Sequence, residues 1–419
     1  MLRPASQNEA ETVVAIQAAA FGFANSPAQA ERYASLREEL SHGLQDWLLF
    51  EYGGRPVGAV RVLPQRLRIG RAVVRNADIG GVAILPELHG RGLGTQMMQE
   101  TMQHIRDSAF ATSRLGGLAR FYERFGYVRF PRRYVEIKVG QSARAGALTV
   151  QHTLSPLPPD IAAHISPYNP ARHAQAWASM AESFLQRYSG SPVIAPTAAP
   201  GAAPLSMVFE DDDRLLGYFR ARLYDSDRTE FEAELTVGEF YYDIDRPDVL
   251  RALILHLAWI AREKGIGRIT LRLPFDPVIL DALCELPIFF QTIQTYGGLS
   301  SNMMQVVSVR NLLEALRPEL EARLDEAPPV ERAAIRIEVE CHGARLLLDG
   351  RSLLVEPDGP AQATLNLSHR LMVEMALGLV SFHEVMESGL TESLRNHPAA
   401  LNVLRILFPR RLVFSGVWG

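Results

Sequence analysis

The pattern of hydrophobic and polar positions predicts strands and helices that alternate along the chain. Residues 48–62 and 207–221 each contain an apolar strand, a polar turn and a second apolar strand, the pattern of an antiparallel hairpin. Over residues 98–109 apolar side chains recur every three or four positions, which predicts an amphipathic helix. Elements mixed in this way indicate an α+β (mixed α/β) fold.

The most informative stretch joins an apolar strand to that helix. Positions 82–98 have the sequence VAILPELHGRGLGTQMM. Gly90, Gly92 and Gly94 allow the backbone to turn tightly and to approach a ligand. At the start of a helix such a turn can bind phosphate oxygens through backbone N–H groups, here those of Arg91, Gly92, Gly94 and Thr95. Taken alone, the pattern also fits a tight connection without a ligand.

The two hairpins align without gaps at a constant offset of 159 residues. The identical pairs are Phe50 and Phe209, Glu51 and Glu210, Arg55 and Arg214, Gly58 and Gly217, and Arg61 and Arg220. Five identities in two hairpins can arise by chance. We nevertheless predict a duplicated domain, because a strand, a turn, a helix and another strand follow each hairpin.

The second copy lacks the glycine turn. Residues 245–250 read DRPDVL, in which Pro247 and Asp248 favour the start of a helix but no glycine admits a phosphate. The carboxylates of Asp245 and Asp248 would also repel one. We therefore expect one cofactor site, in the N-terminal half, and a second copy that serves architecture or shapes the acceptor pocket.

After residue 305 the pattern changes again. Segments 335–340, 344–349 and 362–368 are typical of strands, and residues 369–388 predict a helix. We expect a small mixed sheet with helices on one face. The predicted domains are 1–153, 154–305 and 306–419.

The composition of the chain excludes several classes of function. The formal net charge of −4 over 419 residues argues against nonspecific nucleic-acid binding, which needs a basic surface. The only two cysteines, Cys284 and Cys341, do not have the spacing of metal ligands, so we expect no metal site. They also suggest no disulfide framework, so we expect a protein of the reducing cytoplasm. No apolar run reaches the length of a membrane span. His383-Glu384 lacks a second histidine at helical spacing, so a surface or capping role is expected there.

The strand and glycine turn at 78–98, followed by ARFYERFGYVRF at 119–130, resemble the GNAT acetyltransferases. With a degenerate second unit and a terminal domain similar to sterol carrier proteins, the chain resembles the Eis (enhanced intracellular survival) family of aminoglycoside acetyltransferases. The resemblance implies acetyl-CoA as co-substrate, a homohexamer, and a cofactor site made of Val82, Ala83, Ile84, His89, Gly90, Arg91, Gly92, Leu93, Gly94 and Thr95. His89 departs from the family, whose loop usually has Arg or Gln there, so we expect altered affinity.

The resemblance also implies two catalytic groups. Tyr122 matches the general acid of the family, and the terminal carboxylate, here on Gly419, matches its proposed base. From the residues alone, Tyr122 fits a core tyrosine on a strand equally well, and Phe121, Phe125 and Tyr127 are expected mainly in the core. For Gly419 the alternative is a frayed chain end.

We therefore expect an acetyl-CoA-dependent N-acetyltransferase that acts by direct transfer on the amine of a cationic acceptor. The acceptor would be aminoglycoside-like, a polyamine or a lysine. The acidic residues available near the first helix are Glu9, Glu11, Glu31, Glu38 and Glu39. The alternative is a noncatalytic module that binds a lipid or a partner and keeps a vestigial acetyltransferase fold.

Overall fold

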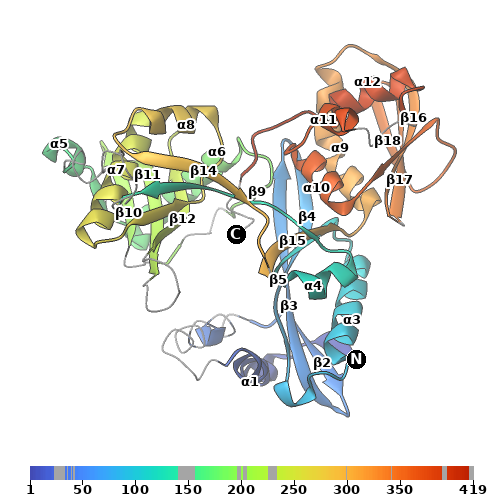
Figure 1. Cartoon of the computed structure of the whole chain (residues 1–419), viewed down its shortest axis with the longest axis horizontal. Helices are drawn as coiled ribbons and strands as arrows, with labels where there is room; N and C mark the ends of the chain where they lie inside the picture. The colour runs from blue at the N-terminus through green and yellow to red at the C-terminus, as the bar shows by residue number, and fades with distance from the viewer. Residues whose placement is uncertain are drawn as a thin grey trace, which may run out of the picture.

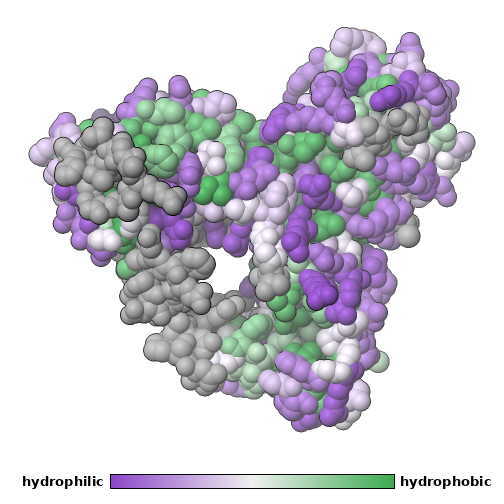
Figure 2. Space-filling model, in the orientation of Figure 1, coloured by the Kyte–Doolittle hydropathy of each residue, from purple (hydrophilic) through white to green (hydrophobic). Residues whose placement is uncertain are grey.

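The computed structural model of the chain describes residues 1–22, 34, 36–38, 40, 43–139, 156–195, 200–201, 205–224, 234–298, 300–340, 342–388 and 394–414. Three sheets form three lobes (Figure 1). The first sheet occupies the lower and central part of the view, the second lies to its left and the third to its upper right. Figure 2 shows an open gap between the second lobe and the lower part of the first.

The first sheet combines segments from both halves of the chain. Its order is β1 (Leu2–Pro4), β2 (Trp47–Tyr52), β3 (Arg55–Ile69), β4 (Ala72–Ile84), β5 (Thr112–Leu118), β15 (Ser300–Val306) and β6 (Val128–Arg129), with β9 (Ser191–Pro192) also paired to β3. Only β4 and β5 run parallel, and the other neighbours are antiparallel. Helix α1 (Ala10–Phe21) packs against β3 and β4.

The predicted amphipathic helix is α3 (Leu93–Asp107). Met98, Met102 and Ile105 are buried in the core, as their spacing predicts. The helix ends two residues before Ala109, which was expected to continue it. Ala109 has a φ of 57°, and its N–H bonds the carbonyl of Arg106, so the chain leaves the helix through a left-handed residue.

The second sheet has the order β8 (Ile165–Pro167), β10 (Ser206–Asp211), β11 (Arg214–Tyr224), β12 (Glu234–Tyr242), β13 (Arg268–Leu271), β7 (Arg132–Lys138) and β14 (Phe289–Thr295). Its helices are α5 (Pro159–Ala162), α6 (Pro170–Leu185), α7 (Pro247–Glu263) and α8 (Pro277–Cys284). Helix α6 contacts β11 and β12, and α7 contacts β11, β12 and β13.

The two aligned hairpins have the same register. Phe50 lies opposite Gly58 and Glu51 opposite Pro56, and at the offset of 159 Phe209 lies opposite Gly217. The register shifts after Phe50 in one copy and after Phe209 in the other. A shared irregularity is stronger evidence of equivalence than a shared strand pattern, because a bulge is a specific local feature. The parallel pair β4–β5 also corresponds to the parallel pair β12–β13.

Equivalent strands are exchanged between the two sheets. Strand β7 follows β6 in the chain but lies between β13 and β14 of the second sheet. Strand β15 follows β14 and lies between β5 and β6 of the first sheet. Neither sheet is complete without a strand from the other half. The boundaries at 153 and 305 remain predictions, and the exchange shows that these two halves do not separate as independent sheets.

The third sheet is small and mixed, as predicted. Its order is β18 (Ser352–Glu356), β17 (His342–Gly350), β16 (Val330–Val339) and β19 (Ala363–Leu367), with only β16 and β19 parallel. Helices α9 (Val309–Asp325) and α12 (Pro398–Leu407) pack against it. The helix expected over 369–388 is instead two helices, α10 (His369–Leu377) and α11 (Phe382–Glu387). Gly378 ends the first one with a φ of 81°.

Two smaller expectations concern α11 and the cysteines. Ser381 and Glu384 form a capping box at the start of α11, which confirms the capping role expected near His383-Glu384. Cys284 is free and exposed, and Cys341 lies outside the described residues.

Candidate active site

A cleft opens where strands β4 and β5 separate. They pair only from Asn76 to Ile79 on β4, whereas β5 continues to Leu118 alongside β15. Beyond Ile79, β4 pairs with β3 alone. The resulting cleft has a volume of about 740 Å³. Its lining residues are Phe21, Ile79, Gly80, Gly81, Val82, Ala83, Ile84, Leu88, His89, Gly90, Gly92, Leu93, Gly94, Thr95, Met97, Gly116, Gly117, Leu118, Phe121 and Tyr122.

The end of β4 presents free backbone groups to the cleft. The N–H of Leu85 bonds the carbonyl of Val57 at 2.9 Å, so Ile84 and Gly58 form a pair whose N–H and C=O groups face away from each other. The alternation of peptide groups then points the N–H of Ile84 and the carbonyl of Val82 into the cleft. The N–H and C=O of Ala83 face β3 instead. Ala83 therefore lines the cleft without offering backbone hydrogen bonds.

His89 has a role that the sequence did not reveal. Its Nε2 lies 2.9 Å from the carbonyl oxygen of Ile84, so the ring donates a hydrogen bond from the turn back to the strand. The turn and the strand end are thereby tied together at the mouth of the cleft. No periodicity or charge pattern in the sequence signals a bond between residues five positions apart in a loop.

The glycine turn forms an anion-binding geometry at the start of α3. Gly90 and Gly92 have φ angles of 77° and 78°, in the left-handed region that favours glycine. Within the described part of the chain no acceptor binds the N–H of Arg91, Gly92, Leu93 or Gly94. These donors, together with the helix dipole, favour negative charge.

One of the four predicted N–H donors, that of Thr95, is not free. The N–H of Thr95 already bonds the carbonyl of Gly92 at 3.0 Å, so only its hydroxyl is available to a ligand. The Arg91 side chain is exposed and does not line the cleft.

The corresponding turn of the second copy is filled by its own side chains. Helix α7 begins at Pro247, and Arg246 pairs with Asp248 in its first turn at 2.8 Å. Asp248 supplies the negative charge that the helix start favours. No glycine in this turn provides a left-handed backbone. The asymmetry between the two copies, predicted from the sequence, is present in their backbones.

Tyr122 lies on the wall of the cleft opposite β4, the strand that leads into the glycine turn. It ends a short helix, α4 (Ala119–Tyr122), and is not on a strand, since the segment continues as a 3-10 turn before β6. Its ring meets Phe121 edge to face, with centroids 4.9 Å apart. Burial raises the pKa of the Tyr122 hydroxyl to about 12. The phenol therefore stays protonated, a hydrogen-bond donor, throughout the neutral range.

The other aromatic side chains of this segment divide between cleft and core. Tyr127 is buried and its hydroxyl lies 2.6 Å from that of Ser113, as expected of a core tyrosine. Phe121, also expected in the core, lines the cleft. Phe125 is half-buried.

Gly419, the other predicted catalytic residue, lies outside the described residues. The preceding segment is packed against the second lobe. Val413 and Phe414 are buried, and Ser189 bonds the chain on both sides of Val413, to the carbonyl of Leu412 and from the N–H of Phe414, each at 2.9 Å.

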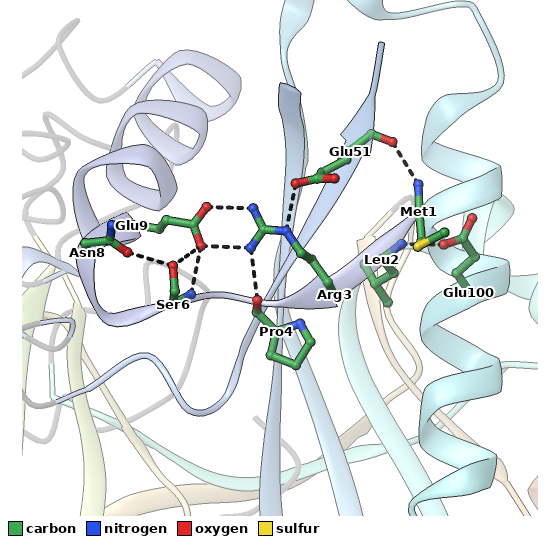
Figure 3. A network of polar contacts seen from close by, with 9 residues as sticks. All are labelled: Met1, Leu2, Arg3, Pro4, Ser6, Asn8, Glu9, Glu51 and Glu100. Carbon is green, nitrogen blue, oxygen red and sulfur yellow. Dashed lines mark hydrogen bonds and ion pairs between the residues drawn. The ribbon is translucent and has the colours of Figure 1, made fainter. Parts of the chain in front are cut away.

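Two of the acidic residues near the first helix, Glu9 and Glu11, are engaged in structural contacts, and Figure 3 shows those of Glu9. Both carboxylate oxygens of Glu9 accept hydrogen bonds from Arg3, at 2.8 and 2.6 Å, and Arg3 also donates to Glu51 at 2.7 Å. The guanidinium lowers the pKa of Glu9 to about 2. Glu11 pairs with Arg37 at 2.7 Å. Through Arg3 of β1, Glu9 links the residue before α1 to β1, and Glu51 links β2 to β1. Glu31 and Glu39 lie outside the described residues.

Two further features of the described residues bear on the site. They contain no group of three or more histidine, cysteine or acidic side chains placed to hold a metal ion. None of the helices in the described part of the chain is long and apolar enough to cross a membrane.

Comparisons with known proteins bear on the fold and on the first 130 residues. Residues 1–130 match the family model of the acetyltransferase (GNAT) domain. No curated protein matches the chain. Solved structures similar over 99% of the chain include a GCN5-related N-acetyltransferase from Anabaena variabilis (18% identity, TM-score 0.63, 98% of that chain covered) and a probable N-acyltransferase from Enterococcus faecalis (15%, 0.66, 98%).

A third similar structure is Eis1 from Mycobacterium abscessus, at 18% identity and a TM-score of 0.59, with 99% of each chain covered. At these identities the three structures establish a shared fold. The family match covers residues 1–130, and it is to an acetyltransferase (GNAT) domain, the enzyme class that the sequence predicts.

Proposed function

We propose that the chain transfers the acetyl group of acetyl-CoA directly to the amine of an acceptor. One observation carries this proposal: a cleft between two separating strands joins unpaired N–H donors at a helix start to a buried, protonated tyrosine. The N–H groups of Gly92, Leu93 and Gly94 fit the pyrophosphate. The N–H of Ile84 and the carbonyl of Val82 fit the amides of the pantetheine arm.

The reaction needs an attacking amine, relief of charge on the carbonyl oxygen and a proton for the leaving thiolate. The amine nitrogen forms the new C–N bond, the C–S bond breaks, and the thiolate of CoA takes a proton. Tyr122 is placed to donate that proton, and the edge of β4 that faces the cleft is our candidate for polarising the thioester carbonyl. The proton that the amine loses leaves to solvent or to a base, for which the carboxylate of Gly419 remains our candidate.

The raised pKa of Tyr122 limits how the proton moves. A phenol of pKa about 12 is a weaker acid than a thiol near pKa ~8.5 by about 3.5 units, or about 5 kcal/mol in the free enzyme. Full transfer before the C–S bond breaks would be too costly. We therefore place proton donation late, when negative charge has accumulated on sulfur, so that a hydrogen bond from Tyr122 stabilises the leaving thiolate.

The wider assignment rests on resemblance. The matching register of the two hairpins supports a second, degenerate GNAT-like domain. The small mixed sheet supports a terminal domain similar to sterol carrier proteins. An Eis-like enzyme, a hexamer, a cytoplasmic location and an aminoglycoside-like, polyamine or lysine acceptor complete the proposal.

The rival proposal is a noncatalytic module that binds a lipid or a partner. The glycine turn argues against it, because a vestigial site would be free to lose the left-handed glycines, as the second copy has. Calorimetry with acetyl-CoA, followed by a screen of amines with CoA release as the readout, tests the enzyme directly. If the protein does not bind acetyl-CoA, the noncatalytic binding module remains as the proposal.

A further inference from the structure

Two small cavities adjoin the cleft at Gly116. The first, of about 240 Å³, is lined by Asp78, Arg114, Leu115, Gly116, Arg132, Asn302, Met303 and Met304. The second, of about 140 Å³, shares Gly116, Arg132 and Asn302 with it. Gly116 also lines the cleft, next to Gly117 and close to Tyr122. The cleft and both cavities thus share Gly116, and charged side chains line the far part of the cavities.

The exchange of strands brings these side chains together. Asp78 and Arg114 lie on the parallel strands β4 and β5, opposite each other in register. Arg132 begins β7 where the chain leaves the first sheet, and Asn302 arrives on β15, paired with Gly116. The backbone of Asn302 also accepts a hydrogen bond from Phe130 at 2.9 Å, which holds the crossing segments together. Both halves of the chain therefore build this subsite.

The charges of the subsite do not cancel. Arg114 donates to Asp78 at 2.7 Å, and Gln65 donates to the same carboxylate at 2.9 Å. The negative charge of Asp78 is therefore already balanced by Arg114. Arg132 is exposed, and its side chain makes no hydrogen bond or ion pair with any described residue, so the side chains of the subsite carry a net positive charge.

Two polar groups of the lining residues are sealed from the cavities. Nδ2 of Asn302 and Nε of Arg114 are buried and have no partner in the described part of the chain, so a ligand would reach them only after these side chains move. Arg132 is therefore the cation that a ligand would meet first. A carboxylate offers several acceptor sites and the charge that Arg132 lacks.

We infer that the acceptor is a small amine that also carries a carboxylate, of the size of a free amino acid, bound with its carboxylate near Arg132 and its amine toward Gly116. This inference rests on the proposed function and specifies its acceptor. It differs from a polycationic acceptor, which the uncompensated charge of Arg132 would repel. The two cavities are small, which favours an amino acid over a bulky amine.

The test compares amines that differ only in the carboxylate. L-Lysine and cadaverine form one pair, L-phenylalanine and 2-phenylethylamine another, and spermidine serves as the polycation. The readout is kcat/KM from CoA release. We expect each amino acid to exceed its decarboxylated partner by about tenfold or more, the size of one charged hydrogen bond. Equal rates, or a preference for spermidine, would overturn the inference while leaving the enzyme proposal intact.

Variants at Arg132 connect the preference to this side chain. Arg132→Met should raise KM for L-lysine about tenfold and leave cadaverine unchanged, and Arg132→Lys should restore part of the preference. Arg66→Met, at an exposed arginine of β3 that lines neither cavity, is the matched control and should behave as wild type. If the ratio of kcat/KM for L-lysine to kcat/KM for cadaverine is the same in Arg132→Met as in wild type, the inference is also overturned.

A binding measurement separates the two proposals. Calorimetry of L-lysine with protein saturated by CoA should show about tenfold weaker binding to Arg132→Met than to wild type. If that difference appears but no amine releases CoA, the transfer reaction is wrong and the carboxylate site stands. If L-lysine binds both proteins equally or binds neither, the carboxylate site is wrong.

Discussion

The ring of Tyr122 packs so closely on Gly117 that a Cβ added to that glycine would lie 2.6 Å from Cε2 of the tyrosine. Gly117 does not have a left-handed φ, so space, not backbone conformation, requires glycine here. The last residues of β5 thereby set the position of the proposed acid in the cleft. Neither residue alone would identify this relationship in the sequence.

Gly117→Ala should therefore displace Tyr122. We expect kcat to fall by about ten- to a hundredfold, since small displacements of a catalytic group have costs of this size. Acetyl-CoA affinity should change little, because the phosphate donors lie elsewhere. Steady-state kinetics and calorimetry measure both. Gly238→Ala, where an added Cβ would meet nothing within 4 Å, is the control for the cost of alanine in a strand.

Tyr122→Phe tests the acid itself. General acid catalysis contributes about 10²- to 10⁴-fold, so kcat should fall within that range while acetyl-CoA binding is retained. Because burial raises the pKa of Tyr122 to about 12, its ionisation should cause no loss of wild-type activity between about pH 8 and about pH 10. Equal kcat in the two proteins would contradict the role of Tyr122 as the acid, whereas a fall with a midpoint near pH 9 that disappears in Tyr122→Phe would contradict only the raised pKa. Tyr127→Phe, in the core beside Ser113, should lower stability but keep turnover.

Gly92→Ala tests the phosphate turn. The φ of 78° makes alanine strained there by about 1 kcal/mol, although an added Cβ would meet nothing within 4 Å. Relaxation of the turn would misalign its N–H donors, and we expect acetyl-CoA affinity to fall about tenfold or more by calorimetry.

Gly265→Ala is the matched control for that experiment. Gly265 also has a left-handed φ, 66°, and open space around it, but it lies in the second lobe beyond α7. The Gly265→Ala variant should lose a similar free energy of unfolding, and its affinity for acetyl-CoA should not change. Equal affinity in both variants would show that the glycine turn does not hold the cofactor.

The sequence predicted those parts of the site that depend on local structure. The glycines of the turn, the amphipathic face of α3 and the loss of glycines in the second copy all follow from residues close together in the chain. The break of the expected 369–388 helix at Gly378 is also local, but it was missed because the apolar pattern continues across the glycine.

Features that depend on distant residues could not be predicted. Hairpin patterns do not say which sheet a strand joins, so the exchange of β7 and β15 has no signal in periodicity. In the sequence the carboxylate of Glu9 is available to a cationic acceptor, but in the structure Arg3 binds it. The subsite at Arg132 and Asn302 depends on the same exchange, since these residues are 170 positions apart.

The exchange predicts how the chain behaves when it is cut between residues 139 and 156. Residues 1–139 alone would lack β15, which pairs with β5 along seven residues, and residues 156–419 alone would lack β7. Each fragment would expose unpaired strand edges, so we expect both to aggregate when produced separately. Produced together, they should form a stable one-to-one complex in gel filtration. Soluble, folded residues 1–139 by circular dichroism would contradict the exchange.

Glu319 joins α9 of the third lobe to the turn between β3 and β4. One carboxylate oxygen accepts the backbone N–H of Arg71 at 2.7 Å, and the other accepts from Arg323 and Arg411, each at 2.9 Å. Glu319 and Arg323 are both buried. Removing one partner of a buried ion pair leaves an uncompensated charge, which costs about 3–5 kcal/mol. We therefore expect Glu319→Gln to lower the free energy of unfolding by about that amount, measured by urea denaturation.

Glu326→Gln provides the comparison for Glu319→Gln. Glu326 pairs with Arg71 at 3.5 Å, but both side chains of this pair are mostly exposed, so the loss should stay below about 1 kcal/mol. If the two variants lose equal stability, the buried contacts of Glu319 contribute no more than a surface pair. In that case the first and third lobes would be held together mainly by the apolar core that α9 shares with β4, since Val74 and Leu316 belong to one buried cluster.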